Sequence, residues 1–342
     1  MTTYRARWLV PICESPIENG EVDVENGRIT YVGPARSSAS VTDFGDAILM
    51  PGLVNAHCHL ELTVMRGFLE DLDFRRWILR LVSAKRAVLT PELLLDSARA
   101  GLEEGIRAGI TTYADTCDSG VVLQAMVEYG VRGIMYQELF GPDPSQCASS
   151  IAEFKTKLAA HRGRETGLAR VGISPHAPYT VSDDLYRAST ALALAESLPM
   201  AVHVAESDPE WALIVDGKGA FAEGLRGRGI QVEPRASSPL QLMQKLGVLE
   251  ARPLLIHCVR ADDRDLSAVA AAQAPVAHCP VSNAKLGHGI APLLEILAAG
   301  ITVGLGSDSM ASNNRMDLLE EARAALLFQR ARVGTHEALN AH

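Results

Sequence analysis

Two histidines separated by a single residue, His57 and His59, follow an apolar run over residues 47–54 that predicts a buried strand. Residues at positions i and i+2 of an extended chain project to the same face, so we expect the two imidazoles to lie side by side. Neutral imidazole is a ligand for zinc or ferrous iron, and a catalytic ion needs further protein ligands and an open position for water. The pair therefore predicts half of a metal site, although histidines also pair by chance.

From about residue 49 onward, apolar strands alternate with helical stretches such as 91–108 and 184–197. Eight parallel-type strands with intervening helices predict an α/β fold, a TIM-like (β/α)8 barrel. A doubly wound sheet is the less suitable alternative, because polar side chains follow many different strands. The strands are predicted at residues 53–56, 111–114, 133–137, 169–174, 200–204, 254–258, 276–279 and 301–305.

Three strand-like segments precede this pattern, at residues 4–11, 21–33 and 47–54. The second contains Asn26-Gly27 between alternating residues, a sequence typical of a two-residue hairpin turn. We therefore expect two domains: a small β-sandwich-like module over residues 1–48 and a metal-dependent hydrolase barrel over residues 49–342.

Side chains capable of chemistry gather at the predicted carboxyl ends of the strands, which is where the active site of such a barrel is built. Two carboxylates belong to this set, Glu206 after the fifth strand and Asp308 after the eighth. Surface histidines in solvent would have no reason to follow strand ends, whereas ordinary core packing remains an alternative for His278 and His288. Seven of the ten histidines lie at or shortly beyond these ends: His57, His59, His176, His203, His257, His278 and His288.

Composition excludes several classes of function. The net charge of -9 argues against binding to a nucleic-acid backbone, which requires clustered Lys and Arg. No run approaches 18 consecutive apolar residues, so no membrane span is expected, and the N-terminus shows no secretory signal. The six cysteines form no C-x-x-C pair, which is typical of reduced thiols in a cytoplasmic protein.

Six sequence strings occur in the order in which one family has them: PGLVNAHCHLEL, SPHAPYTVS, HVAES, LLIHCVR, HCPVSNAKLGHG and GLGSDSMASNN. On these strings the chain resembles the amidohydrolase superfamily, in particular its cytosine-deaminase-like branch, which includes methylthioadenosine/S-adenosylhomocysteine deaminases and chlorohydrolases. The resemblance implies catalytic roles for Glu206 and His257 and a substrate contact for His176. It also implies four metal ligands, namely His57, His59, His203 and Asp308.

These residue types suit hydrolysis at a carbon that bears an amine. A bound divalent ion lowers the pKa of its water from about 15.7 towards about 7. Asp308 can accept a proton from that water, Glu206 can carry a proton to the ring nitrogen and assist the departure of ammonia, and His257 can orient the water. For Glu206 the alternative is an ordinary carboxylate at a helix start.

One divalent ion, zinc or else iron, is expected rather than two. Binuclear members of the superfamily carry a carboxylated lysine at the end of the fourth strand, and residues 170–174 contain no lysine. Zinc deaminases of the cytidine type combine H-x-E with P-C-x-x-C. His59-Leu60-Glu61 supplies the first part, but the second is absent from the sequence, so Glu61 is expected to be a structural or pocket-rim carboxylate.

The segment over residues 65–77 resembles the loop that covers the purine nucleoside in the methylthioadenosine deaminases, with Trp77 at the position of a pocket aromatic. Packing in the core beside Phe74 is the alternative for Trp77. Residues 135–142 are closer to the aminodeoxyfutalosine deaminases. The predicted function is therefore hydrolytic deamination of an adenine-bearing nucleoside. The alternatives are a triazine or cyclic-amidine hydrolase and a catalytically silent metal-binding barrel.

The family usually continues past the eighth helix with strands that complete the small β-module, whereas this chain ends at His342. The β-sandwich is therefore expected to be incomplete. Exposed strand edges favour association, so a homo-oligomer is a further expectation.

Overall fold

The computed structural model describes residues 1–36 and 40–340. Residues 37–39 and the last two residues, Ala341 and His342, lie outside the described residues. Contacts between residues divide the chain into two compact units, Met1–Leu53 and Val54–His342. Within the described ranges, no helix is both long and apolar enough to cross a membrane. The six cysteines are all free.

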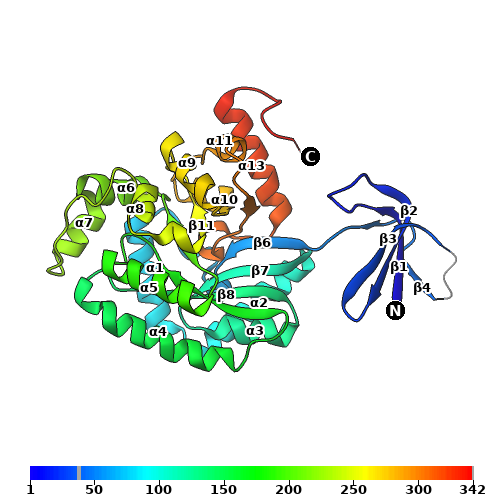
Figure 1. Ribbon diagram of the computed structural model, residues 1–342, viewed down its shortest axis with the longest axis horizontal. Coiled ribbons are helices and arrows are strands. Elements are labelled where there is room, and N and C mark those ends of the chain that lie inside the picture. Colours follow the sequence, from blue (N-terminus) through cyan, green and yellow to red (C-terminus); the bar gives the residue numbers. More distant parts are fainter. Residues whose placement is uncertain (37–39, 341–342) are drawn as a thin grey trace. The chain divides into compact units, whose positions relative to one another are not determined.

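The first unit is a five-stranded sheet built around its first strand (Figure 1). Strand β1 pairs antiparallel with β2 and parallel with β4 and β5. Asn26 and Gly27 connect β2 to β3 with φ values of 50° and 73°, which confirms the predicted hairpin turn. The strands are β1 (Thr2–Leu9), β2 (Ile17–Glu25), β3 (Arg28–Pro34), β4 (Val41–Asp43) and β5 (Ile48–Leu49).

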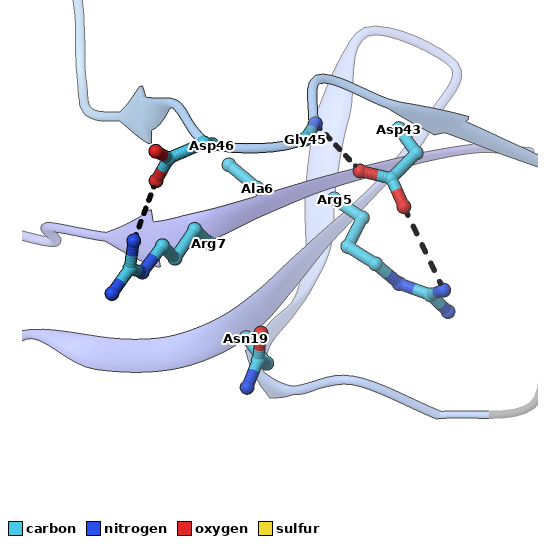
Figure 2. Close-up of a pocket in the computed structure, with 7 residues that line it drawn as sticks. All are labelled: Arg5, Ala6, Arg7, Asn19, Asp43, Gly45 and Asp46. Atoms are coloured by element: carbon cyan, nitrogen blue, oxygen red, sulfur yellow. Dashed lines mark hydrogen bonds and ion pairs between the residues drawn. The ribbon is translucent and has the colours of Figure 1, made fainter.

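A pocket on this unit is lined mainly by charged side chains that pair with one another (Figure 2). Arg7 lies 2.9 Å from Asp46, and Arg5 lies 4.0 Å from Asp43. Because its cations and carboxylates neutralise each other, this pocket presents no excess charge to a ligand.

The prediction of one buried strand over residues 47–54 is wrong. Strand β5 ends at Leu49 and belongs to the first unit, whereas a new strand, β6 (Leu53–Cys58), begins the second. Pro51 lies between them and has no N–H to donate to a strand ladder, which separates the run into two pieces. Ile48 is 65% exposed and therefore lies outside any core. His57 consequently lies inside a strand rather than beyond one.

The second unit contains the eight predicted strands in two four-stranded sheets, and the pairings β7-β8-β9 and β10-β11-β12-β13 are parallel. In Figure 1, β6, β7 and β8 lie side by side, and helices α2 and α3 pack on this sheet. The strand order is β6-β7-β8-β9 in one sheet and β10-β11-β12-β13 in the other. Their bounds are β6 (Leu53–Cys58), β7 (Ile110–Cys117), β8 (Arg132–Leu139), β9 (Ala169–Pro175), β10 (Ala201–Val204), β11 (Leu254–His257), β12 (Val276–His278) and β13 (Val303–Leu305).

Helices separate the strands, and the two that the pattern predicted agree with α2 and α5 to within about one residue at each end. Thr90 caps α2 by accepting a bond from the Leu93 N–H, with Pro91 in the first turn, and Ser182 caps α5 through the Leu185 N–H. The longer helices are α1 (Phe74–Val88), α2 (Pro91–Arg107), α3 (Val121–Tyr129), α4 (Cys147–Arg162), α5 (Asp183–Glu196), α7 (Gly219–Arg226), α9 (Asp263–Ala272) and α13 (Leu318–Val333). The shorter ones are η1 (Leu60–Met65), η2 (Pro144–Gln146), α6 (Asp208–Trp211), η3 (Ala212–Asp216), α8 (Pro239–Lys245), η4 (Val248–Ala251), α10 (Pro280–Lys285), α11 (Leu293–Ala298) and α12 (Met310–Asn313).

The two sheets also touch at both of their outer edges. An isolated parallel bridge joins Ile173 of β9 to Met200, and a second joins Cys58 of β6 to Asp308. Buried side chains from β8, β10, β11 and β12 pack together in one cluster, although these strands belong to different sheets. The cluster consists of Tyr136, Ala201, Ile256, Ala277 and Cys279.

The edge between β6 and the segment after β13 is tightly connected. The Asn55 side chain donates to the Ser307 hydroxyl at 2.8 Å and accepts from the Ser307 N–H at 3.1 Å. Gly306 fits here because it lacks a side chain: a Cβ on it would lie 2.9 Å from both the backbone nitrogen and the Cβ of His57. This contact fixes where Asp308 lies relative to His57.

We expect Gly306→Ala to lower the free energy of unfolding by about 1–3 kcal/mol, because the added methyl group meets backbone and packed side chains that cannot move aside. Urea denaturation measures the change. The matched control is Gly163→Ala, where the nearest atom to the new Cβ is 3.9 Å away and φ is -68°, and which should change stability by less than about 0.5 kcal/mol. Equal stability of the two variants would contradict the close packing at Gly306.

Candidate active site

The four residues expected to bind metal lie together at the carboxyl ends of three strands. His57 belongs to β6, His59 follows it, His203 belongs to β10 and Asp308 follows β13. Nε2 of His57 is 3.2 Å from Oδ1 of Asp308, and Nε2 of His59 is 3.5 Å from the same oxygen. The ring centres of His57 and His203 are 4.8 Å apart, as are those of His57 and His59. The fold thus gathers these side chains around His57, which shares one group of possible ligands with His59 and Asp308 and another with His203.

Neighbouring polar groups orient these side chains. The Ser282 and Ser312 hydroxyls both donate to Oδ2 of Asp308, at 2.5 and 3.0 Å, which leaves Oδ1 facing the histidines. Nδ1 of His203 lies 3.3 Å from the backbone oxygen of His176. Because that oxygen can only accept, Nδ1 carries the proton and the lone pair is on Nε2. Such partners fix the tautomer of a metal-binding histidine.

The charge states of this cluster are those that a divalent cation requires. Burial lowers the pKa of His59 to about 3, with a further contribution from His57. Burial also lowers the pKa of His203, again helped by neighbouring histidines. Burial alone would raise the pKa of Asp308, but His57 and the other histidines hold it well below its usual value. Three neutral imidazoles and one carboxylate form a donor set that fits a divalent metal ion.

A second group lies beside the first and contains Glu206. Its Oε1 is 3.6 Å from Nε2 of His257 and 3.3 Å from Nε2 of His288. The His257 ring lies 5.8 Å from that of His57, and its Nδ1 is 3.0 Å from Oδ1 of Asn283. Burial alone would raise the pKa of Glu206, but His257 and His288 lower it, so the carboxylate is ionised and able to accept a proton.

The alternative interpretation of Glu206 as a helix-start carboxylate finds little support in the geometry. Helix α6 begins at Asp208, and Ser207 is its N-cap, accepting from the Glu210 N–H. Instead, Glu206 precedes the helix and faces two histidines. The same turn contains Ala205 at a φ of 54°, and His257 and Asp308 also have positive φ values, of 78° and 57°.

Glu210 holds this turn in place, and the sequence analysis missed it. Its carboxyl oxygens accept the backbone N–H groups of Ala205 and Glu206, each at 2.8 Å. Burial raises the pKa of Glu210 to about 8. The signal that could have revealed it is the spacing Ser207-x-x-Glu210, which is typical of a helix N-terminus.

His176 lies next to His203, with their ring centres 4.9 Å apart. It follows β9, and its Nδ1 is 2.7 Å from the Thr180 hydroxyl. Tyr179 contacts it at 5.7 Å between ring centres, and Phe221 stacks on Tyr179 at 4.3 Å. Phe221 was not singled out from the sequence, because α7, which contains it, is far from this loop along the chain.

Trp77 is buried on α1, with its ring centre 6.4 Å from that of Phe74. The ring centre of Phe74 in turn lies 4.5 Å from that of His288. Within the described residues, the indole Nε1 of Trp77 has no hydrogen-bond partner. Trp77 therefore packs in the core beside Phe74, and its role as a pocket aromatic stays a prediction.

Glu61 is engaged in a buried ion pair, and His278 is buried at the end of β12. The carboxylate of Glu61 contacts Lys85 and the Ser119 hydroxyl. Burial alone would raise the pKa of Glu61, but the neighbouring Lys85 ammonium lowers it. These contacts fit the structural role that the sequence favoured for Glu61.

The sequence profile of the amidohydrolase family matches residues 48–341. The chain belongs to the amidohydrolase family. Among curated relatives, this amidohydrolase is 32% identical to a 5-methylthioadenosine/S-adenosylhomocysteine deaminase of Moorella thermoacetica, over 98% of the chain and 76% of the relative. It is 31% identical to the protein of the same name from Halothermothrix orenii, over 92% of the chain and 71% of the relative.

Solved structures of similar fold include zinc-bound enzymes. An adenosine deaminase from Xanthomonas campestris with bound zinc superposes with a TM-score of 0.83 at 24% identity, over 99% of this chain and 76% of the other. The atrazine chlorohydrolase of Arthrobacter aurescens complexed with zinc gives 0.84 at 23% identity, over 99% and 79%. The aminofutalosine deaminase of Helicobacter pylori, in complex with methylthio-coformycin, gives 0.84 at 19%, over 96% and 82%. At these identities the likeness concerns the fold, and the amidohydrolase family is metal-dependent.

We expect Lys85→Met to lower the free energy of unfolding by about 3 kcal/mol, because it leaves the buried Glu61 carboxylate without its cation. The double variant Lys85→Met/Glu61→Gln should recover part of this loss. Arg107→Met, which breaks an exposed pair with Glu103, is the control and should cost less than about 1 kcal/mol. Strictly additive effects in urea denaturation would argue against a coupled Lys85–Glu61 pair.

Proposed function

We propose that this chain is a metal-dependent hydrolase that removes the 6-amino group of an adenine-bearing nucleoside as ammonia. The observation that carries the proposal is Glu206, a buried carboxylate held between two histidines beside a cluster of three imidazoles and Asp308. The names of the curated relatives, 5-methylthioadenosine/S-adenosylhomocysteine deaminases at 32% and 31% identity, support the substrate class.

We also propose that the two four-stranded sheets close into one eight-stranded barrel. The parallel bridges at both outer edges, Ile173 to Met200 and Cys58 to Asp308, support closure. Residues 1–48 are proposed to form a separate, small β-sandwich-like module, and residues 49–342 the barrel. The boundary between the two compact units, at Leu53, supports this division.

The proposed cofactor is a single zinc ion held by His57, His59, His203 and Asp308. The donor set supports it, as does the β9 segment, where residues 170–174 offer no lysine that could bridge a second ion. When bound, such an ion supplies a hydroxide nucleophile at neutral pH by lowering the pKa of a water molecule.

The chain's own residues then move the protons. Water adds at C6 of the purine, so a C–O bond forms, the C6–N bond breaks, and ammonia leaves. Glu206 takes one proton from the attacking water and delivers it to the ring nitrogen next to C6, and Asp308 takes the other and passes it to the amino group, which leaves as ammonia. His257, fixed by Asn283, orients the water. The lowered pKa of Glu206 supports its role as a proton acceptor before it acts as a donor.

His176 and Trp77 are proposed to recognise the nucleoside rather than the metal. Support for His176 comes from its position next to His203 but beyond the four clustered ligands. Support for Trp77 comes from its buried, unpartnered indole nitrogen behind Phe74, as judged over the described residues.

A triazine or cyclic-amidine hydrolase on the same scaffold is the second candidate, supported by the fold likeness to the atrazine chlorohydrolase. A catalytically silent metal-binding barrel is less favoured, because a protein that only binds needs neither Glu206 nor His257.

The purified enzyme should release ammonia from adenosine, methylthioadenosine, S-adenosylhomocysteine or an aminodeoxyfutalosine, and the rate with triazines should be much lower. Activity should disappear after chelation and return with about one zinc per chain. A coupled ammonia assay and elemental analysis measure both. Turnover of triazines but of no nucleoside would replace the proposal by the second candidate, and two zinc ions per active chain would overturn the single-ion site.

Glu206→Gln should lower kcat by about 10²–10⁴-fold while the metal content stays normal, because the amide cannot carry the proton. His203→Ala should lose both the metal and the activity. Glu153→Gln, at a side chain that is 69% exposed, serves as the control and should behave as the unmodified protein. If Glu206→Gln retained full turnover with its metal, Glu206 would be structural.

A further inference from the structure

The groups proposed to react lie in the interior of the protein, although a substrate has to reach them from solvent. Asp308, Glu206 and His257 are each at most 6% exposed. Such small accessible surfaces offer a molecule the size of a nucleoside little to bind. Admission of a substrate therefore requires part of the protein to move, and the segments around the site differ in how firmly they are held.

An aromatic cluster joins three of these segments. The ring centre of Phe74, on α1, lies 4.5 Å from that of His288, one of the two histidines at the proposed proton carrier. Tyr179, in the loop after β9, lies 5.7 Å from His176. Phe221, on α7, stacks on Tyr179 at 4.3 Å and packs at a right angle against Phe74 at 6.0 Å between ring centres. Phe221 is half-buried, whereas the other two rings are buried, so it lies on the solvent side of the cluster.

Two of the three segments are anchored by charged side chains. On α1, Lys85 forms the buried ion pair with Glu61. The loop after β9 is held by Arg235, whose guanidinium donates to the Asp183 carboxylate at 2.7 Å and to the Pro178 carbonyl at 2.6 Å. Hydrogen bonds to an ionised group are stronger than neutral ones. Movement of α1 or of this loop would break such bonds.

The third segment, residues 217–232 around α7, has no such anchor. Among the described residues, its hydrogen bonds all end within residues 212–232, and none of its side chains forms a salt bridge. Arg226 spans the base of the segment by donating to the carbonyls of Gly217 and Val232, at 2.7 and 3.1 Å. The segment is therefore tied to itself rather than to the strands that carry the site.

The surroundings of α7 also allow it to move as one piece. Its main neighbours are α6 and η3, which directly precede it in the chain (Figure 1). Gly219, the first residue of α7, and Gly229, three residues beyond its end, have φ values of 84° and 79°. Glycine adopts these and many other backbone angles at little steric cost, so both positions suit a hinge.

We propose that residues 217–232 form a mobile cover that opens to admit the substrate, and that Phe221 holds this cover closed against Phe74 and Tyr179. The closed cover retains the bound substrate. Phe221 acts through the two rings that it contacts and is therefore a positioning residue. This inference rests on the proposed function for the identity of the substrate, whereas the movement itself follows from how the three segments are anchored.

Hydrogen–deuterium exchange of the zinc-loaded enzyme measures the opening. Peptides from residues 217–232 should exchange at least about tenfold faster than those of α5, because the cover opens without global unfolding. Saturating inosine, the product of adenosine deamination, should slow this exchange. In Phe221→Ala the cover should exchange about tenfold faster than in the unmodified protein, since both aromatic pairs are lost. Phe221→Tyr retains the ring and should restore slow exchange.

Kinetics and zinc release test the same variants. In Phe221→Ala, KM for adenosine should rise about tenfold while kcat changes less than about threefold, because retention of the substrate is lost and the reacting groups stay in place. EDTA should also remove the zinc several-fold faster. The matched control is Phe44→Ala, which removes a part-exposed phenylalanine stacked on Tyr4 in the first unit and should change none of these values. Circular dichroism checks the fold of each variant.

The remaining outcomes contradict the inference. Exchange in residues 217–232 as slow as in α5, or no protection by inosine in an enzyme that deaminates adenosine, would overturn the mobile cover. A loss of kcat in Phe221→Ala with unchanged exchange would make Phe221 a fixed wall of the site. If the unmodified enzyme deaminates no adenine nucleoside, the proposed function fails. The cover is then judged by ligand-free exchange and zinc release, and equal values for Phe221→Ala and the unmodified protein would overturn it alone.

Discussion

The contact between β6 and the segment after β13 is the constraint on which the site depends. The Asp308 N–H donates to the His57 carbonyl at 2.9 Å, which joins residues that are 251 positions apart in the sequence. Gly306 allows this close approach, and Asn55 reinforces it through Ser307. Without that edge contact, the histidines of β6 would have no carboxylate beside them, and the pKa of Asp308 would rise with its burial.

The buried polar groups around this contact depend on one another. Neutral histidines avoid mutual repulsion only because the interior suppresses their protonation, and the two ionised carboxylates, Asp308 and Glu206, are stable only because histidines surround them. Ser282, Ser312 and Thr116 then fix the orientation of individual rings and oxygens. A change at one group therefore alters the charge balance of the others.

Much of this arrangement could be predicted because it is local in the sequence. Each of the eight strands is a short apolar run followed by polar residues, so both the strands and the polar groups at their ends were found. The run over residues 47–54 was misassigned because apolar composition concealed the break at Pro51. Glu210 was missed although its spacing from Ser207 is typical of a helix N-terminus. Phe221 was missed for a different reason: nothing in its own neighbourhood marks it out, and the tertiary structure alone brings it to Tyr179.

The backbone of the site carries a consequence of its own. The backbone φ values of Ala205, His257 and Asp308 are 54°, 78° and 57°. These values lie in the left-handed region, where each residue other than glycine loses about 1 kcal/mol or more of stability. The strain is concentrated at the turns that position the active-site side chains, and packing around these turns must stabilise the strained backbone. The strained backbone at these three positions lowers the free energy of unfolding, and it fixes the direction of the side chains at the site. Relieving that strain, for example with glycine, would favour stability at the expense of the geometry that the reaction needs.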